Sequence, residues 1–208
     1  MQTKQSVYNV NESREHIIRK ATILFLQKSF KAVTMKDIVE STGFSKGAFY
    51  HYFPSKESLF LEVVDTYFSM LSIDFQQLTN SSLFQFYHSY IESAYEKFMK
   101  LKDFLEDTND EDDLTYIRLM MDAITLFPGF KEQIRLFHDK ELSAWEKVMK
   151  EAIKQGEITT SLLPMQLAKI FVYVSDGVGQ RLIMQGEVRN LQKELLVIWD
   201  GLYTDLRT

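Results

Sequence analysis

Residues 34–59 read TMKDIVESTGFSKGAFYHYFPSKESL, the pattern of two short helices joined by a tight turn and followed by a third helix. Thr34, with Asp37 three residues later, is a capping-box variant that marks the start of a helix. Gly43 follows this helix at a position where glycine adopts a positive φ without steric cost. Ser45 is then placed to cap the next helix. The stretch therefore predicts a helix-turn-helix, an architecture that reads DNA.

The second helix of this motif is expected to have a buried and an open side. Phe49 and either Tyr52 or Phe53 fall three to four residues apart and can face inward. The open side is then short, small and basic, as base-edge and phosphate contacts require. Its members are Lys46, Gly47, Ala48, Tyr50 and His51.

The stretch resembles the TetR family of bacterial transcriptional regulators. The specific part is the aromatic run YHYF followed by PSKE, and an amphipathic helix over about residues 12–29 precedes it at a suitable distance. Two positions depart from the family pattern, which commonly has alanine at Val39 and often threonine at Ala48. Valine at position 39 affects the packing of the helix. Alanine at position 48 removes a possible hydroxyl contact to DNA.

The resemblance implies a homodimer whose heads read the two halves of a palindromic operator in double-stranded DNA, while a helical body binds a small-molecule inducer. It further implies that the regulator is a repressor. It also assigns the DNA contacts position by position. From the first helix of the motif, Thr34 and Lys36 are expected to contact a phosphate or a base. The residues expected to face the groove are Ser45, Lys46, Gly47 and Ala48. Those expected to bind phosphates are Tyr50, His51 and Lys56.

Charge is distributed unevenly along the chain, which carries −5 in total. Residues 1–58 contain nine Lys or Arg against five Asp or Glu, a net of +4, so the remaining 150 residues carry −9. Attraction to phosphate is screened over about 10 Å at ordinary salt, so a basic end can bind DNA while an acidic body stays away from it. The asymmetry predicts a two-part molecule.

Composition limits the possible classes of protein. The chain has 208 residues, 45% of them hydrophobic, and no cysteine, which excludes disulfides, thiolate metal sites and thiol nucleophiles. No stretch approaches the roughly 18 uninterrupted apolar residues of a membrane span, and the N-terminus has no apolar signal core. We expect a soluble, cytoplasmic protein without membrane contact.

Apolar spacing and break residues predict an all-α fold of about nine helices. Beyond the helix at 12–29 and the two helices of the motif, we expect a long helix from Ser55 to about residue 79. Further helices are predicted at about 82–102, 111–127, 130–155, 164–187 and 189–206. We divide the chain into a DNA-binding domain, residues 1–54, and a ligand-binding and dimerisation domain, residues 55–208.

No constellation of residues indicates an enzyme, a metal site or a cofactor. Residues 103–113 contain seven acids, but Asp112 replaces the turn glycine of an EF-hand loop and Arg118 replaces its closing glutamate. A solvated acidic segment is the better interpretation. The four histidines are far apart in sequence, and no phosphate-binding glycine loop or nucleophile elbow is present.

The body is rich in aromatic and methionine side chains, most of which ordinary core packing explains. A surplus of tyrosine and methionine is also typical of an adaptable apolar pocket. We select Tyr90, Tyr116, Met120 and Phe171 as candidate ligand contacts. The alternative is a body that recognises a protein partner, and a cavity would count against that reading.

The last two predicted helices each carry an apolar stripe and are expected to form the dimer. Gly177 and Gly179 each cost about 1 kcal/mol in an exposed helix, for which close approach of another helix can compensate. In the family, this helix pair forms a four-helix bundle with its twin, and Asp176-Gly177 resembles the usual small-residue position there.

Overall fold

The computed structural model describes residues 10–79, 81–105 and 115–208, with the backbone alone for residues 115 and 116. The helices run in the order α1 (Val10–Gln27), α2 (Met35–Thr42), α3 (Lys46–Tyr52), α4 (Lys56–Leu71), α5 (Leu83–Leu105), α6 (Thr115–Leu126), α7 (Pro128–Lys154), α8 (Pro164–Gln185) and α9 (Leu191–Leu206), with a 3-10 turn, η1 (Val188–Asn190), before α9. Over these residues the sheet content is one isolated bridge, between Ile158 and Arg207. The predicted all-α class is confirmed.

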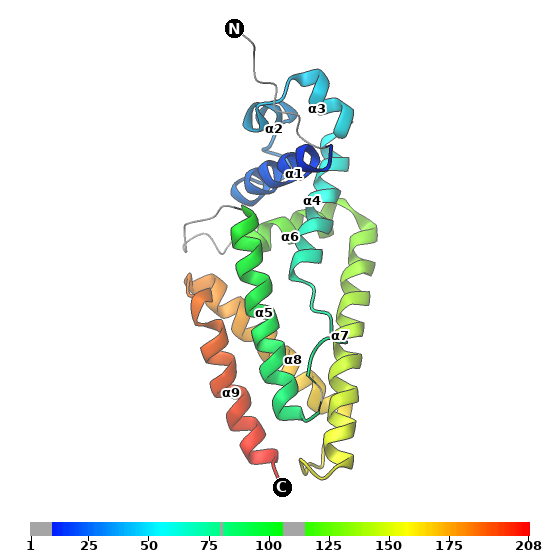
Figure 1. Ribbon diagram of the computed structural model, residues 1–208, viewed down its shortest axis with the longest axis vertical. Helices are drawn as coiled ribbons and strands as arrows, with labels where there is room; N and C mark the ends of the chain where they lie inside the picture. The colour runs from blue at the N-terminus through cyan, green and yellow to red at the C-terminus, as the bar shows by residue number, and fades with distance from the viewer. Residues whose placement is uncertain (1–9, 80, 106–114) are drawn as a thin grey trace.

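The molecule is elongated, with the helix-turn-helix of α2 and α3 at one end (Figure 1). We call α1–α3 the head and α5–α9 the body. In Figure 1, α4 descends from the head toward the body, α6 crosses beneath the head, and α5, α7, α8 and α9 run along the long axis. None of the helices in the described segments is long and apolar enough to cross a membrane.

The local signals of the helix-turn-helix form as predicted. Thr34 and Asp37 make a reciprocal capping box at the start of α2, and Gly43 ends that helix with φ 71°. The Ser45 hydroxyl then accepts a hydrogen bond from the Ala48 amide at the start of α3. These caps satisfy backbone groups that a helix end would otherwise leave unpaired.

Helix α4 ends at Leu71, so the prediction of one helix to residue 79 was wrong. The competing structure is a turn around Asp74. Its carboxylate accepts the backbone amide of Gln76 at 3.1 Å and the side-chain amide of Gln77 at 2.9 Å, and its carbonyl accepts the Gln77 amide at 3.0 Å. Aspartate side chains favour such local bonds over helix continuation. Residues 72–76 therefore cross the body as an irregular segment.

The hydrophobic core consists of two clusters. The first joins the head to α4 and α6, so that Phe25, Phe60 and Ala123 are all buried in it. The second fills the body between α5, α7, α8 and α9 around Trp145 and Trp199, which are fully buried with ring centroids 5.2 Å apart. Because α4 contributes to the core of the head, the boundary proposed at residue 54 runs through one packed cluster.

Glu157 holds the lower end of the body together. Its carboxylate accepts the backbone amides of Leu83 at 2.9 Å and Phe84 at 3.2 Å, and the Tyr203 hydroxyl at 3.1 Å. A carboxylate at the first amides of α5 is favoured by the helix dipole. One side chain thus joins the α7–α8 connection to α5 and α9.

We expect Glu157→Ala to lower the free energy of unfolding by about 1–3 kcal/mol, because it leaves amides at the start of α5 without partners. Urea unfolding followed by circular dichroism measures this. Glu151→Ala is the matched control, since Glu151 is half-exposed and its ion pair with Lys154 is 3.7 Å long. An equal loss in the two variants would contradict the role of Glu157.

Candidate DNA-binding surface and body cavity

The outer face of α3 is open, as predicted. Ser45, Lys46, Gly47, Ala48, Tyr50 and His51 are all exposed. Phe49 and Phe53 are buried on the opposite side and anchor the helix to the head. Lys46 lies with its ammonium 5.9 Å from the centre of the Tyr50 ring. The face therefore presents small residues and hydrogen-bond donors without an apolar obstruction.

The two predicted contacts at the start of α2 are also exposed. Thr34 donates its hydroxyl to Asp37 at 2.7 Å, and this bond helps to lower the pKa of Asp37. Lys36 pairs loosely with Glu40, at 3.7 Å, and its side chain is 81% exposed. Such an exposed pair contributes little stability, so Lys36 can exchange it for a phosphate.

Lys56 is engaged within the protein. Its ammonium donates to the carbonyls of Phe30 at 2.9 Å and Val33 at 2.8 Å, and it lies 4.3 Å from the centre of the Phe30 ring. These contacts tie the start of α4 to the loop between α1 and α2. A phosphate contact for Lys56 stays a prediction, and it would compete with these bonds.

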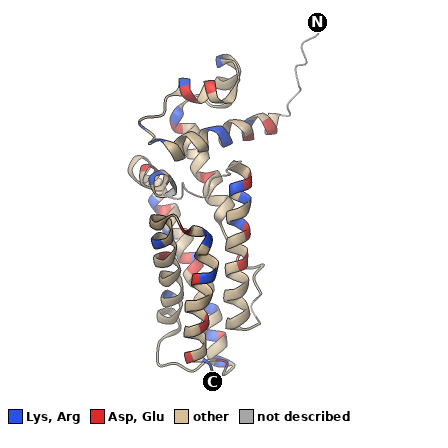
Figure 2. Ribbon diagram, turned by 90° about the vertical axis from the view of Figure 1, so that its left-hand side faces the viewer, with Lys and Arg blue, Asp and Glu red and all other residues tan. Residues whose placement is uncertain are grey.

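Arg14 braces the head. Its guanidinium pairs with Glu62 of α4 at 2.7 Å and lies 5.2 Å from the Phe53 ring. The hydrogen bond from Arg14 lowers the pKa of Glu62. Figure 2 shows both signs of charge on the helices of the head and along the body.

The body contains a cavity of about 340 Å³, which we call the body cavity. It is above the lower end of the size range of ligand pockets, about 300 Å³. Its wall combines α4, the 72–76 segment, α5, α7, α8 and the start of α9. The residues lining it are Tyr67, Leu71, Ile73, Phe75, Tyr90, Ile91, Ala94, Tyr95, Phe98, Phe137, Glu141, Ser175, Ile183, Val188, Arg189, Leu191, Gln192 and Leu195.

A larger open depression, which we call the outer groove, lies between the 72–76 segment and α7. Its lining includes Asp139, Ala144 and three residues that also line the body cavity. These shared residues are Ile73, Phe75 and Phe137. The irregular segment thus forms part of the wall between the groove and the cavity.

The three predicted ligand contacts whose side chains are described, Tyr90, Met120 and Phe171, do not converge. Tyr90 lines the body cavity, whereas Phe171 is fully buried in the aromatic core around Trp145. Met120 packs against the cluster beneath the head. The side chain of Tyr116 lies outside the described residues. Of the three whose side chains are described, Tyr90 is the one that the structure places at the cavity.

Two residues that line the body cavity, Phe75 and Glu141, were not predicted from the sequence. Phe75 was assigned to a helix that ends earlier, so its placement could not be anticipated. Glu141 carried a usable signal, because it is an acid within the buried stripe of α7 that includes Trp145 and Val148. Its exposed fraction is 7%, and it accepts a hydrogen bond from the Tyr90 hydroxyl at 2.8 Å.

Burial sets the electrostatics of this pair. It raises the pKa of Glu141, with a smaller opposing effect from the Tyr90 hydrogen bond. It also raises the pKa of Tyr90, which the nearby carboxylate raises further. Tyr90 is therefore a donor at all ordinary pH values, and it points its proton at the acid.

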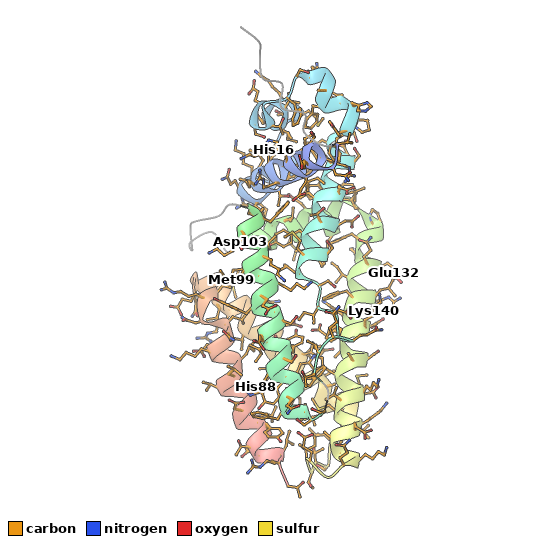
Figure 3. The ribbon with its side chains drawn as sticks, in the orientation of Figure 1. His16, His88, Met99, Asp103, Glu132 and Lys140 are labelled. Atoms are coloured by element: carbon orange, nitrogen blue, oxygen red, sulfur yellow. The ribbon has the colours of Figure 1, made fainter. Side chains whose placement is uncertain are left out.

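No group of three or more potential metal ligands occurs within the described ranges. His16 lies in the head and His88 low on α5 (Figure 3), where they serve local contacts. His16 lies 3.2 Å from the Thr42 carbonyl and His88 3.3 Å from Asp200. The acidic segment considered for calcium is described only in part, since residues 106–113 lie outside the described residues.

Residues 17–63 match the sequence profile of the bacterial regulatory proteins of the tetR family. These residues form a DNA-binding domain of the TetR family. The match covers α1 from Ile17 onward, all of α2 and α3, and the first half of α4. The TetR-family relatives are transcriptional regulators rather than enzymes.

Two relatives are similar over most of the chain. The HTH-type transcriptional regulator YfiR of Bacillus subtilis is 25% identical over 86% of this chain and 84% of its own. The HTH-type transcriptional repressor DhaR of Mycobacterium sp. is 21% identical over 91% of both chains.

Solved structures share the fold. A TetR-family regulator from Agrobacterium tumefaciens superposes with a TM-score of 0.67 at 16% identity, over 96% of this chain and all of its own. SmeT in complex with triclosan superposes with a TM-score of 0.64 at 16% identity, over 94% of this chain and 92% of its own. The resemblance deduced from residues 34–59 thus extends to the body.

We expect Lys46→Ala to weaken operator binding and to reduce the slope of log K against log[salt] by roughly 0.9, because one phosphate-neutralising charge is lost. Fluorescence anisotropy measures this with a duplex selected from random DNA. Tyr50→Phe should weaken binding with the slope unchanged, and Lys150→Ala, at an exposed position on α7, should alter neither value. A wild-type slope in Lys46→Ala would remove the phosphate assignment.

Proposed function

We propose that the protein is a homodimeric repressor that binds a palindromic operator through its two heads and is released when a small molecule occupies the body cavity. The observation that carries this proposal is the position of α4. Its first half packs in the core of the head through Leu59 and Phe60, and its last turns line the cavity through Tyr67 and Leu71. A ligand that displaces the end of α4 therefore acts on the helix that supports the DNA-binding head.

A second connection runs through α6. Asp122 accepts the backbone amide of Phe30 at 2.7 Å, and Arg118 donates to the Gln27 carbonyl at 2.8 Å. Both bonds hold the end of α1. If the ligand prefers a body conformation in which the heads are wrongly spaced, its differential affinity for the two states lowers operator affinity.

The cavity favours a small molecule over a protein partner as the regulator. Its volume of about 340 Å³ and its mainly apolar and aromatic wall suit a compact organic ligand. SmeT, which has the same fold, was solved as a triclosan complex. A body that recognised only a protein surface would not need an internal cavity.

Outward faces of α8 and α9 support the dimer. Apolar side chains are exposed on both helices, at Ile170, Tyr173, Met184, Val197 and Ile198. Gly177 and Gly201 are also exposed, and a Cβ added at either would meet nothing within this chain. Small residues among exposed apolar ones allow helices of a second copy to approach closely.

Val197→Lys should dissociate the dimer, because it places a charge at the centre of the apolar face of α9, where Val197 is 65% exposed in the single chain. Sedimentation equilibrium at micromolar concentration should give twice the 24.4 kDa chain mass for wild type and the chain mass for the variant. Met121→Lys, at an exposed position on α6, should remain dimeric. A wild-type monomer that binds a palindrome tightly would contradict the proposed architecture.

Filling the cavity should abolish induction. In wild type, at least one compound from a panel of aromatic molecules that includes triclosan should weaken operator binding about fivefold or more. Ala94→Phe places a ring in the cavity and should remove this response while operator affinity without the compound is retained. Ala144→Phe, in the outer groove, is the control. A full response in Ala94→Phe would locate the regulatory site elsewhere.

A further inference from the structure

We propose that the body cavity selects organic cations with an aromatic body, and that Glu141 is their counter-ion. This inference rests on the proposed regulation by a small molecule, and it assigns the charge of that molecule. It follows from the chemistry of one buried side chain and of the rings around it.

Glu141 is a buried acid without a basic partner. It lies on α7, lines the cavity and is 7% exposed. Tyr90 donates to one of its carboxylate oxygens at 2.8 Å. Within the described part of the chain, no Lys, Arg or His forms an ion pair with it.

Such a group is costly for a protein core. A buried carboxylate needs either a counter-charge or a proton, and replacing it with an apolar residue of similar volume is often neutral or stabilising. Burial accordingly raises the pKa of Glu141. A ligand cation in the cavity would supply, in direct contact, the counter-charge that no ion pair among the described residues gives Glu141.

The surroundings of Glu141 suit the rest of such a ligand. The rings of Phe75 and Tyr90 are stacked with centroids 6.3 Å apart, and Tyr95, Phe98 and Phe137 complete an aromatic wall. The face of an aromatic ring attracts an organic cation, and the interaction strengthens where water is excluded. Flat aromatic bodies pack on the same rings.

Three other ionisable groups lie near Glu141 or the cavity, namely Asp176, His138 and Arg189. The charge of Asp176 raises the pKa of Glu141, and that of His138 lowers it. Arg189 also borders the cavity, but its side chain is exposed. Solvent screens an exposed charge, whereas the field of a buried one is screened much less.

Three probes of one ring system test the charge preference. N-methylacridinium is a cation, 9-methylacridine is neutral at pH 8, and acridine-9-carboxylate is an anion. Binding to the full-length protein without DNA is followed by probe fluorescence. We expect the cation to bind about tenfold or more tightly than the neutral probe, and the anion to bind weakest.

Glu141→Gln removes the charge and keeps an oxygen that can accept the Tyr90 hydrogen bond. It should weaken binding of N-methylacridinium about tenfold or more and change that of 9-methylacridine less than about threefold. Glu132→Gln is the matched control, because Glu132 lies on the outer side of the same helix, paired with Arg135 at 2.6 Å (Figure 3). It should leave binding of the cation unchanged.

Tyr90→Phe provides a second test in case Glu141→Gln fails to fold, which circular dichroism would reveal. It keeps the acid and removes its hydrogen bond, so binding of the cation should be retained or strengthened. Loss of cation binding in this variant would assign recognition to the hydroxyl and overturn the inference.

The outcomes separate this inference from the proposed function. Equal or tighter binding of the neutral or anionic probe, or unchanged cation binding in Glu141→Gln, overturns the charge assignment and leaves a ligand-regulated repressor intact. Binding by none of the three overturns the assignment. In that case, release of the operator by another compound in wild type but not in Ala94→Phe would still support the proposed function.

Discussion

Helix α4 is shared by the head and the body cavity, and the proposed function depends on this sharing. Phe60 is fully buried against the head, with its ring 4.9 Å from that of Phe25. One helix of Lys56–Leu71 rises about 1.5 Å per residue, so it spans the distance from the reader to the cavity without a joint. A rigid element of this kind transmits a displacement at one end as a change of orientation at the other.

The termination of α4 is as important as its length. Had the helix continued to residue 79, as apolar spacing predicted, Ile73 and Phe75 would not form the wall between the outer groove and the body cavity. The turn around Asp74 therefore creates this wall. A segment without regular hydrogen bonds is also easier to displace than a helix, which suits a wall that a ligand must pass.

Sequence reasoning succeeded where the determinants are local. Capping by Thr34 and Ser45 and the positive φ of Gly43 depend on residues a few positions away, and these features could be read directly. The cavity depends on which helices pack together, and hence on contacts between residues far apart in the chain. For this reason Tyr90 was selected together with Phe171 and Met120, which have similar chemistry but belong to different clusters.

Lys56 and Arg14 also show that contacts between distant residues cannot be predicted from the sequence. Lys56 was expected at a phosphate, and both residues make contacts inside the protein, Lys56 with the Phe30 and Val33 carbonyls and Arg14 with Glu62. Charge counted along a sequence does not distinguish a cation that faces DNA from one that braces a fold. The exposed Lys46 is the better candidate because, among the residues that the structure describes, no carboxylate or carbonyl engages its ammonium.

Glu141 is the opposite case, because it is an acidic residue at a buried position where packing of the fold does not require one. Its neighbours on the buried stripe of α7, Trp145 and Val148, show that an apolar residue would fit the helix pattern. An acid at such a position lowers stability unless something compensates for it, and within the described residues the Tyr90 hydroxyl is the partner that the fold provides. Residues that break a local rule without structural compensation tend to mark functional sites. The cavity is thus better explained as a site built to bind a cation than as a packing defect, because a packing defect would not require a carboxylate.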